Sequence, residues 1–234
     1  MLASMVGMRA FAIVLAAGSG TRLGVVEPKA FLPVGGGLML VLSSAAAAAS
    51  VSIDGIVVAV PAGFEERATT ALADLDKPVI VVVGAGTRQA SVRIALEAVP
   101  EGIEVVAVHD AARPFARPEL FTSVVAAVVE GADGVVPVVP VADTVKRVRD
   151  GLIVGTEPRE DLVLAQTPQA FRVRVLRMAH ERAVAEGREA TDDAALLEWA
   201  GNPVRTVEGD PANVKITTPE DLRAAGAWIE ADRA

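Results

Sequence analysis

Short apolar runs rich in β-branched residues alternate along the chain with longer stretches in which apolar residues recur at helical spacing. The runs have the length of buried strands, and the stretches have the length of helices. We expect strands at Ala10–Leu15, Gly55–Val60, Val79–Val83, Glu104–Val108 and Gly134–Val139. We expect helices at Leu38–Ala49, Phe64–Leu75, Gln89–Val99, Pro118–Glu130, Val173–Glu186 and Asp192–Ala200. This alternation predicts an α/β fold: a single Rossmann-like, mostly parallel sheet with helices on both faces.

Residues 141–171 break the alternation. Residues 143–148 alternate polar and apolar side chains, Gly151 supplies a turn, and two short apolar runs follow. We expect an extended β-arm that projects from a single domain spanning residues 1–234. Because natural proteins cover exposed strand edges, we expect the same arm of a second subunit to pair with it in a homodimer. An irregular surface insertion is the simpler alternative.

Three loops that follow expected strands carry the candidate chemistry. In open parallel sheets, ligands bind beyond the carboxyl ends of the strands. Residues 18–29, 84–91 and 110–113 each follow such a strand. We therefore expect these loops to lie on one rim of the sheet and to form a single site.

The first of these loops is rich in glycine and contains two basic residues. Gly18 and Gly20 lack a Cβ atom, so a phosphate chain can approach the backbone closely, and Arg22 and Lys29 add positive charge. The glycine spacing excludes the P-loop and the dinucleotide-binding fingerprint. A tight turn with two solvated cations would show the same pattern, so this loop alone does not decide the function.

Composition restricts the class of ligand. The chain has 234 residues, of which 52% are hydrophobic, enough for one large domain with its own core. It carries 22 basic and 30 acidic residues, and this net charge of −8 argues against nucleic acid or an anionic membrane as partner. Cysteine is absent, which excludes disulfides and thiolate chemistry, and no apolar run reaches membrane-spanning length. We expect a cytoplasmic protein that acts on small molecules.

Further segments have to be explained together with the glycine-rich loop. They are Thr-Arg-Gln-Ala-Ser-Val at 87–92, His-Asp-Ala-Ala-Arg-Pro at 109–114, Asp-Thr-Val-Lys at 143–146, Gln-Thr-Pro-Gln at 166–169, Thr-Asp-Asp-Ala at 191–194 and Asn-Val-Lys-Ile-Thr at 213–217. In this order they resemble the 2-C-methyl-D-erythritol 4-phosphate cytidylyltransferases of the non-mevalonate isoprenoid pathway. The resemblance extends from about residue 10 to residue 223.

The resemblance implies that the cytidylyl group of CTP is transferred to the phosphate of 2-C-methyl-D-erythritol 4-phosphate, and that pyrophosphate leaves. It also implies Mg2+, held largely by the triphosphate, and a homodimer whose active sites are shared through the arm. Ribitol 5-phosphate cytidylyltransferases share these motifs and are the nearest alternative. A catalytically silent nucleotide-sugar binding protein is an alternative of another class, against which the presence of both Arg22 and Lys29 argues.

The reaction needs no general base, because the attacking phosphate is already an anion, so catalysis rests on positioning and on electrostatic stabilisation. Arg22 and Lys29 are the catalytic candidates. The nucleotide-binding candidates are Ala16, Ala17, Gly18, Gly20, Arg22, Lys29, Gly84 and Ser91. The acceptor-binding candidates are Asp110, Arg113, Thr144, Arg159, Thr167, Thr191 and Lys215. In this family Thr144 and Arg159 reach the site of the partner subunit. No residue is assigned as a metal ligand, although Asp110 could touch the ion.

Several candidates have simpler interpretations. Asp110 and Arg113 could form a structural ion pair, and Arg159 could be a solvated charge among acidic neighbours. Thr191 could cap a helix, and Ser91 could be an ordinary serine near a helix N-terminus.

Other polar residues are not assigned to the chemistry. Asp192 and Asp193 are interpreted as acids in the first turn of a helix. His109 is expected to be a hydrogen-bonded structural histidine, and His180 is expected on a helix surface. The chain departs from the common family pattern at Ala30, where glutamine is frequent, and at Ala85, which could affect the fit of the base.

Overall fold

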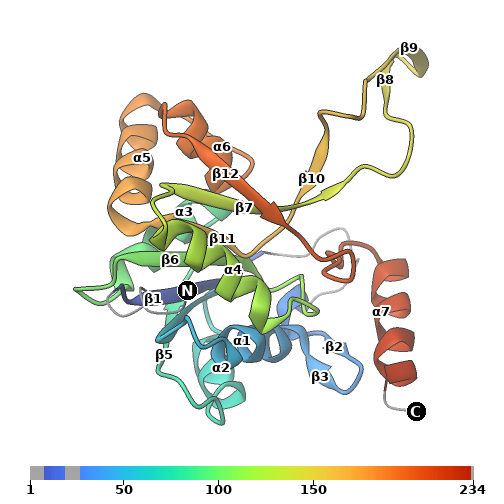
Figure 1. Ribbon diagram of the computed structural model, residues 1–234. Coiled ribbons are helices and arrows are strands. Elements are labelled where there is room, and N and C mark those ends of the chain that lie inside the picture. The colour runs from blue at the N-terminus through green and yellow to red at the C-terminus, as the bar shows by residue number, and fades with distance from the viewer. Residues whose placement is uncertain (1–7, 19–26, 233–234) are drawn as a thin grey trace.

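The β-branched runs form the middle of an eight-stranded sheet in the computed structural model, which describes residues 8–18 and 27–232 (Figure 1). Across the sheet the strands are β10 (Val163–Ala165), β7 (Gly134–Pro140), β11 (Gln169–Arg172), β6 (Val105–Asp110), β1 (Ala10–Leu15), β4 (Gly55–Val60) and β5 (Val79–Val83), and β12 (Val204–Glu208) pairs with β7. Strands β6, β1, β4 and β5 are parallel, whereas β10 and β11 run antiparallel to their neighbours. The expected mostly parallel sheet is confirmed.

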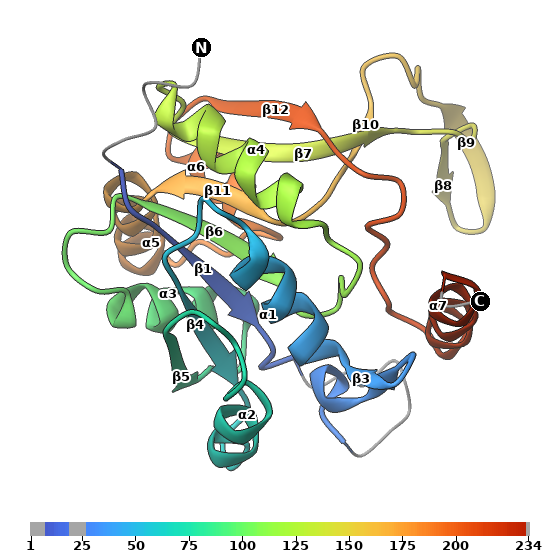
Figure 2. The ribbon, with the colours of Figure 1, turned by 60° about the horizontal axis from the view of Figure 1, so that its bottom comes forward.

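Successive residues of the central strands point to opposite faces of the sheet, and both faces are apolar. In β1, Ala12 and Val14 belong to one core cluster, and Phe11 and Ile13 belong to the other. A parallel sheet needs such two-sided burial because its crossover helices cover both faces. Figure 2 shows the two helical layers. One layer contains α1 (Met39–Ala49) and α4 (Pro118–Val129), and the other contains α3 (Arg88–Ala98), α5 (Val173–Glu186) and α6 (Asp193–Trp199).

The expected elements are confirmed to within two residues at each end, with one exception. Helix α2 (Glu65–Ala71) stops four residues before the expected end at Leu75. The residues after it form turns, and they lead to Pro78, which cannot continue a helix. Strand β6 extends through His109 to Asp110, so these two side chains are held by the sheet rather than by a loop.

Several elements were not expected. The 3₁₀ helix η2 (Lys29–Phe31) and the hairpin of β2 (Pro33–Val34) and β3 (Gly37–Leu38) follow the glycine-rich loop. Strands β11 and β12 complete the sheet, and α7 (Pro219–Asp232) ends the described chain. Among the described residues, none of the helices is both long and apolar enough to cross a membrane.

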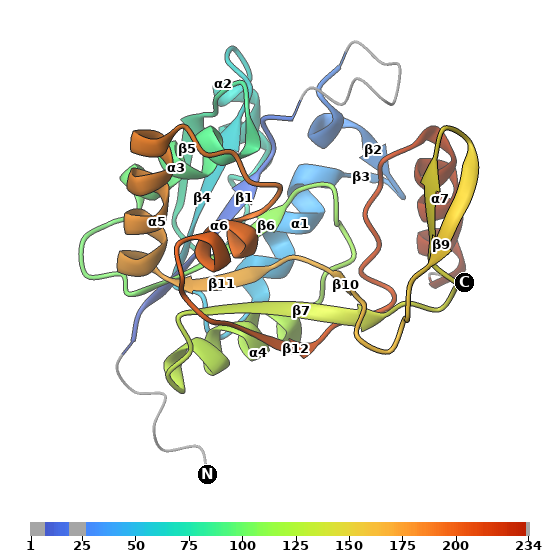
Figure 3. The ribbon, with the colours of Figure 1, turned by 90° about the horizontal axis from the view of Figure 1, so that it is seen from above.

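The arm forms a separate two-stranded antiparallel sheet of β8 (Lys146–Arg149) and β9 (Leu152–Thr156) that projects away from the main sheet (Figures 1 and 3). Asp150 and Gly151 join the strands with φ values of 50° and 78°, which favours a tight hairpin turn. The side chains of Leu152 and Ile153 are 70% and 66% exposed. The projecting arm is therefore observed, and its part in dimerisation stays a prediction.

Candidate active site

The carboxyl ends of β1, β5 and β6 border a cleft of about 470 Å³, which the three expected loops line together with the segment before α7. Its charged lining residues in the described part of the chain are Lys29, Arg88, Asp110 and Lys215. Three of these are basic and one is acidic, an excess of two positive charges in a chain whose net charge is −8. The cleft is therefore suited to a polyanion.

Small residues form one wall of the cleft. The backbone N–H of Ala16 donates to Ala59 O at 2.8 Å, which extends the sheet pairing beyond β1, and Ala17 and Gly18 continue along the cleft wall. A Cβ atom on Gly84 would lie 2.4 Å from the Cβ of Ala17, so glycine is needed where the two loops meet. Gly20 and Arg22 lie outside the described residues, and their roles stay predictions.

Ser91 shapes the second loop from inside. It is buried, and its Oγ accepts from the N–H of Ala85 at 2.9 Å and lies 2.9 Å from Thr87 O. The Thr87 side chain caps α3 by accepting from Ala90 N. Ala85 and Thr87 line the cleft, so Ser91 sets the path of a loop that forms part of the cleft wall. Its direct contact with the nucleotide stays a prediction.

Asp110 is the centre of a charged cluster. Lys215 Nζ donates to its Oδ2 at 2.6 Å, and Arg88 Nε donates to its Oδ1 at 3.2 Å. Burial alone would raise the pKa of this carboxyl, but the charges of Arg88 and Lys215 hold the pKa well below its usual range. Asp110 therefore stays ionised. The Asp110–Arg113 ion pair considered from the sequence is not formed, because Arg113 donates to Asn213 O at 2.7 Å and to Ala165 O at 3.2 Å.

Thr167 and His109 form a chain of hydrogen bonds that holds the backbone of Asp110. Thr167 Oγ1 accepts from the N–H of Asp110 at 3.0 Å and lies 3.0 Å from His109 Nδ1. His109 Nε2 lies 3.2 Å from Arg113 O, which can only accept, so Nε2 carries the proton and the Thr167 hydroxyl donates to Nδ1. The buried hydroxyl gives its only proton to His109 and accepts one hydrogen bond from Asp110, which favours a positioning role for Thr167 over contact with an acceptor.

His109 is the buried structural histidine that the sequence predicts. Burial lowers its pKa to about 4, so it is neutral at pH 7. Its ring also packs edge-on against Phe121 at 5.1 Å between ring centroids. Both ring nitrogens of His109 are engaged within the protein, so His109 has no ring nitrogen available to transfer a proton.

The low pKa of His109 predicts a loss of stability in acid. Between pH 6.5 and about 4 the unfolded chain binds a proton at this histidine and the folded chain does not, so stability falls as the pH falls through this window. We expect the free energy of unfolding to drop by about 2–3 kcal/mol more in the wild type than in His109→Gln between neutral pH and about pH 4.5. Urea unfolding of both proteins at the two pH values measures it. Equal losses would contradict the assignment.

The structure corrects the interpretation of the second histidine and of the acids near α6. His180 is buried on the inner face of α5, not on a helix surface, and its Nε2 lies 3.2 Å from Asp193 Oδ1. Asp193 lies in the first turn of α6 as expected, but it also binds Arg88 at 2.6 Å. Asp192, rather than Thr191, caps α6 by accepting from Ala195 N at 2.8 Å, and Thr191 is exposed.

The structure brings some of the predicted residues together and separates others. Those that line the cleft are Ala16, Ala17, Gly18, Lys29, Ser91, Asp110 and Lys215. Thr144 and Arg159 are exposed on the arm, where Arg159 donates to Ala142 O at 2.6 Å. Arg88 was not predicted, although it lines the cleft and binds two carboxylates.

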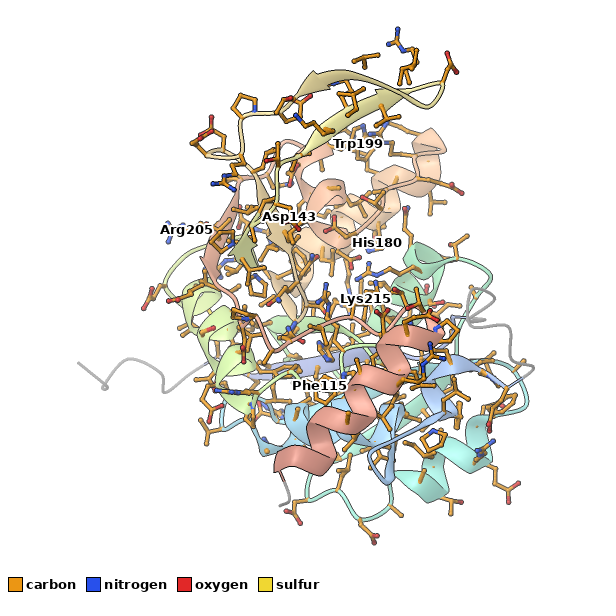
Figure 4. All side chains as sticks on the ribbon, turned by 90° about the vertical axis from the view of Figure 1, so that its right-hand side faces the viewer. Phe115, Asp143, His180, Trp199, Arg205 and Lys215 are labelled. Carbon is orange, nitrogen blue, oxygen red and sulfur yellow. The ribbon has the colours of Figure 1, made fainter. Side chains whose placement is uncertain are left out.

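Lys215 reaches the cleft because the segment that carries it is fixed on both sides. The N–H of Ile216 donates to Ala112 O at 2.8 Å, and the Ile216 side chain is fully buried. Asp221 accepts from the backbone N–H groups of Thr217 and Thr218 and so caps the start of α7. Figure 4 shows Lys215 on this segment beside α7, and Asp143 at the base of the arm.

Comparison with known proteins gives consistent matches. The sequence model of the family described as "IspD: 2-C-methyl-D-erythritol 4-phosphate cytidylyltransferase" matches residues 10–231. The cytidylyltransferase of that name from Corynebacterium diphtheriae is 41% identical over 226 residues, which cover 94% of this chain and 93% of the relative. The crystal structure of the enzyme of that name from Thermus thermophilus has a TM-score of 0.80 and 37% identity, and covers 95% of this chain and all of that one.

A further relative is longer than this chain. The bifunctional enzyme IspD/IspF of Nitratidesulfovibrio vulgaris is 46% identical over 224 residues, which cover 92% of this chain. This chain spans 57% of the length of that relative. The similarity to the bifunctional protein therefore concerns a little more than half of it.

Proposed function

The chain belongs to the family of 2-C-methyl-D-erythritol 4-phosphate cytidylyltransferases, and we propose that it transfers the cytidylyl group of CTP to 2-C-methyl-D-erythritol 4-phosphate. The observation that carries the proposal is the cleft beyond the parallel strands, which is lined by three cations and one carboxylate and has small residues along one wall. The names of the matched relatives favour the methylerythritol acceptor over ribitol 5-phosphate. The cytoplasmic location expected from the sequence stays a prediction.

The reaction is a substitution at the α-phosphorus of CTP. An oxygen of the acceptor phosphate forms a bond to this phosphorus, the bond to the β-phosphate oxygen breaks, and pyrophosphate leaves with that electron pair. Negative charge gathers at the phosphorus and on the leaving group, so fixed cations stabilise the transition state more than the separated substrates. In this chain Lys29 and Arg22 have this role, and Lys29 lines the cleft.

The nucleotide lies against the first two loops in this proposal. Ala16, Ala17 and Gly18 contact it with their backbone and leave space for the base, and Ser91 holds the facing loop. The acceptor lies on the side of the cleft that carries Asp110 and Lys215. In this proposal the ammonium of Lys215 binds the acceptor phosphate. Arg113 and Thr191 do not line the cleft in the described structure, and their contact with the acceptor stays a prediction.

Mg2+ fits this cleft as an ion held largely by the triphosphate. Mg2+ in nucleotide sites usually combines one or two carboxylates with substrate phosphates. Asp110 is the one carboxylate among the cleft-lining residues of the described chain, and it is ionised. When bound, the ion would neutralise part of the triphosphate charge. Asp110 would hold it from the protein side.

Thr144 and Arg159 lie on the arm and do not line the cleft of their own chain. In this proposal the arm carries them to the acceptor site of a second subunit. Leu152, Ile153 and Val154 are exposed on β9, an apolar surface that a second copy of the arm would cover. We propose a homodimer in which each arm delivers its Thr144 and Arg159 to the acceptor site of the partner.

The nucleotide side predicts a preference for CTP. Ala16, Ala17, Gly18 and Ala85 line the cleft with small side chains, and in this proposal the cytosine ring lies against them. We expect kcat/KM for CTP to exceed that for ATP and GTP by at least about 100-fold, because a site whose polar groups are arranged to hydrogen-bond cytosine leaves them unpaired with a purine. Pyrophosphate release at saturating acceptor measures it for each nucleotide. Comparable efficiency with ATP or GTP would place the chain among other nucleotidyltransferases.

A further inference from the structure

A row of polar side chains joined by hydrogen bonds extends from His180 in α5 to the cleft. His180 Nε2 lies 3.2 Å from Asp193 Oδ1, and Arg88 Nη1 donates to Asp193 Oδ2 at 2.6 Å. On its other side, Arg88 Nε donates to Asp110 Oδ1, and Lys215 Nζ donates to Asp110 Oδ2. Figure 4 labels His180 and Lys215, the residues at the two ends of this network.

The inner half of the network is buried. The side chains of Asp193 and His180 are each 2% exposed, and neither residue lines the cleft. Burial would raise the pKa of Asp193, but the charge of Arg88 and the hydrogen bond from His180 hold that pKa below its ordinary value. Asp193 is thus a carboxylate that accepts from both neighbours. Buried ion clusters stabilise a fold no more than apolar side chains of the same size, so stability alone does not account for this one.

The elements that carry the network are fixed independently of it. Gln89 Nε2 donates to Arg188 O at 3.0 Å, and the N–H of Ala190 donates to Gln89 Oε1 at 3.0 Å. This pair of hydrogen bonds holds the segment before α6 against the first turn of α3. The ion pair between Arg88 and Asp193 therefore adds little to joining the two helices, and its effect is on the direction of the Arg88 guanidinium.

We propose that Asp193 and His180 are positioning residues that hold Arg88 in the one orientation that leaves Asp110 available to Lys215. The inference deepens the proposed function and rests on it, because Lys215 is the cation assigned to the acceptor phosphate. Arg88 Nη2 is buried without a hydrogen-bond partner in the described structure, so the guanidinium depends on its two carboxylates. Without the charge of Asp193, the Arg88 guanidinium binds most strongly when two of its nitrogens donate to Asp110. That arrangement displaces Lys215.

The first test is Asp193→Asn, assayed for pyrophosphate release with each substrate varied. Asparagine keeps the shape but places an N–H2 group against one of two donors, Arg88 or His180. We expect KM for the acceptor to rise about tenfold and kcat to fall, a size usual for partners that orient a binding group, while KM for CTP stays within about twofold. Asp133→Asn, which breaks an Asp133–Arg172 contact of 3.7 Å outside the cleft lining, is the matched control and leaves both KM values unchanged.

His180 provides a second pair of variants if Asp193→Asn does not fold. His180→Leu removes the donor to Asp193, and we expect the same rise in acceptor KM to a smaller extent. His180→Gln keeps an N–H donor at similar reach and restores the wild-type value. A merely structural network would lower kcat in proportion to the folded fraction and leave both KM values unchanged. That outcome in Asp193→Asn or in His180→Leu would overturn the proposal.

The two histidines of the chain allow a readout without turnover, because they lie on opposite sides of the network. His109 is joined to Asp110 through Thr167, whereas His180 binds Asp193. In protein labelled with ¹³C-histidine, Asp193→Asn should shift the imidazole signals of both rings, and Asp133→Asn should shift neither. An unchanged His109 signal in folded Asp193→Asn would overturn the proposal. If the wild type releases no pyrophosphate, the proposed function is contradicted. The histidine spectrum then tests by itself whether Asp193 positions the network.

Discussion

Replacing Lys29 by alanine should lower kcat by about 10²–10³, the loss found when a preorganised charge-stabilising donor is removed from a transition state. Lys29 opens η2 at the rim of the cleft and faces the same space as Lys215 and Arg88. The reaction has no general base to compensate, so a missing cation lowers the rate directly. Arg22→Ala should lower kcat to a similar extent, because it carries the same role in the proposal. Initial rates of pyrophosphate release at saturating CTP and acceptor measure both.

Two controls separate lost chemistry from lost structure. Lys29→Arg keeps the charge and should retain more activity than Lys29→Ala. Lys77→Ala removes a lysine that binds Ser50 O away from the cleft lining, and it should leave kcat unchanged. Thermal unfolding should show that Lys29→Ala is folded. A folded Lys29→Ala enzyme whose kcat stays within about threefold of wild type would exclude a transition-state role for this residue.

Arg159→Ala and Lys215→Ala should each be almost inactive as homodimers, and mixing them should restore activity. Lys215 lines the cleft of its own chain, whereas Arg159 is exposed on the arm and donates to Ala142 O. If each arm serves the partner, a mixed dimer contains one site with both residues intact and one site with neither. Random exchange makes half of the dimers mixed, so about a quarter of the wild-type activity should return.

The mixing experiment needs proof that subunits exchange, which differently tagged chains and co-purification provide. Arg149→Ala is the matched control for an exposed arginine of the same arm, and it should remain active by itself. If the subunits exchange and the mixture stays as inactive as its parents, the shared site is contradicted. Arg159 would then be the solvated surface charge that its acidic neighbours suggest.

The strands of the parallel core could be predicted from the sequence because each is an uninterrupted apolar run that ends at a loop. β1, β4 and β5 begin and end at the expected residues. β12 reads Val-Arg-Thr-Val-Glu and is largely exposed, so its apolar content does not distinguish it from a loop. Its place depends on pairing with β7, which lies about 70 residues earlier in the chain and leaves no local signal.

The site residues likewise fall into two groups, those that a local sequence motif marks and those that only contacts with distant residues define. Asp110 and Lys215 stand in motifs and were predicted, whereas Arg88 binds carboxylates 22 and 105 residues away and looks locally like the start of a helix. From the sequence, His180 is expected on a helix surface, and the structure buries it. Its spacing from Leu176 and Ala183 puts it on the buried face of α5, a signal that the sequence contained.

Pyrophosphate release from CTP in the presence of each acceptor decides whether this chain is a cytidylyltransferase and which acceptor it uses. We expect release that depends on 2-C-methyl-D-erythritol 4-phosphate, with one cytidylylated product per pyrophosphate and a kcat/KM at least about tenfold above that for ribitol 5-phosphate. Equal or higher efficiency with ribitol 5-phosphate would contradict the acceptor assignment. Absence of acceptor-dependent release with either compound would contradict the assignment as a cytidylyltransferase.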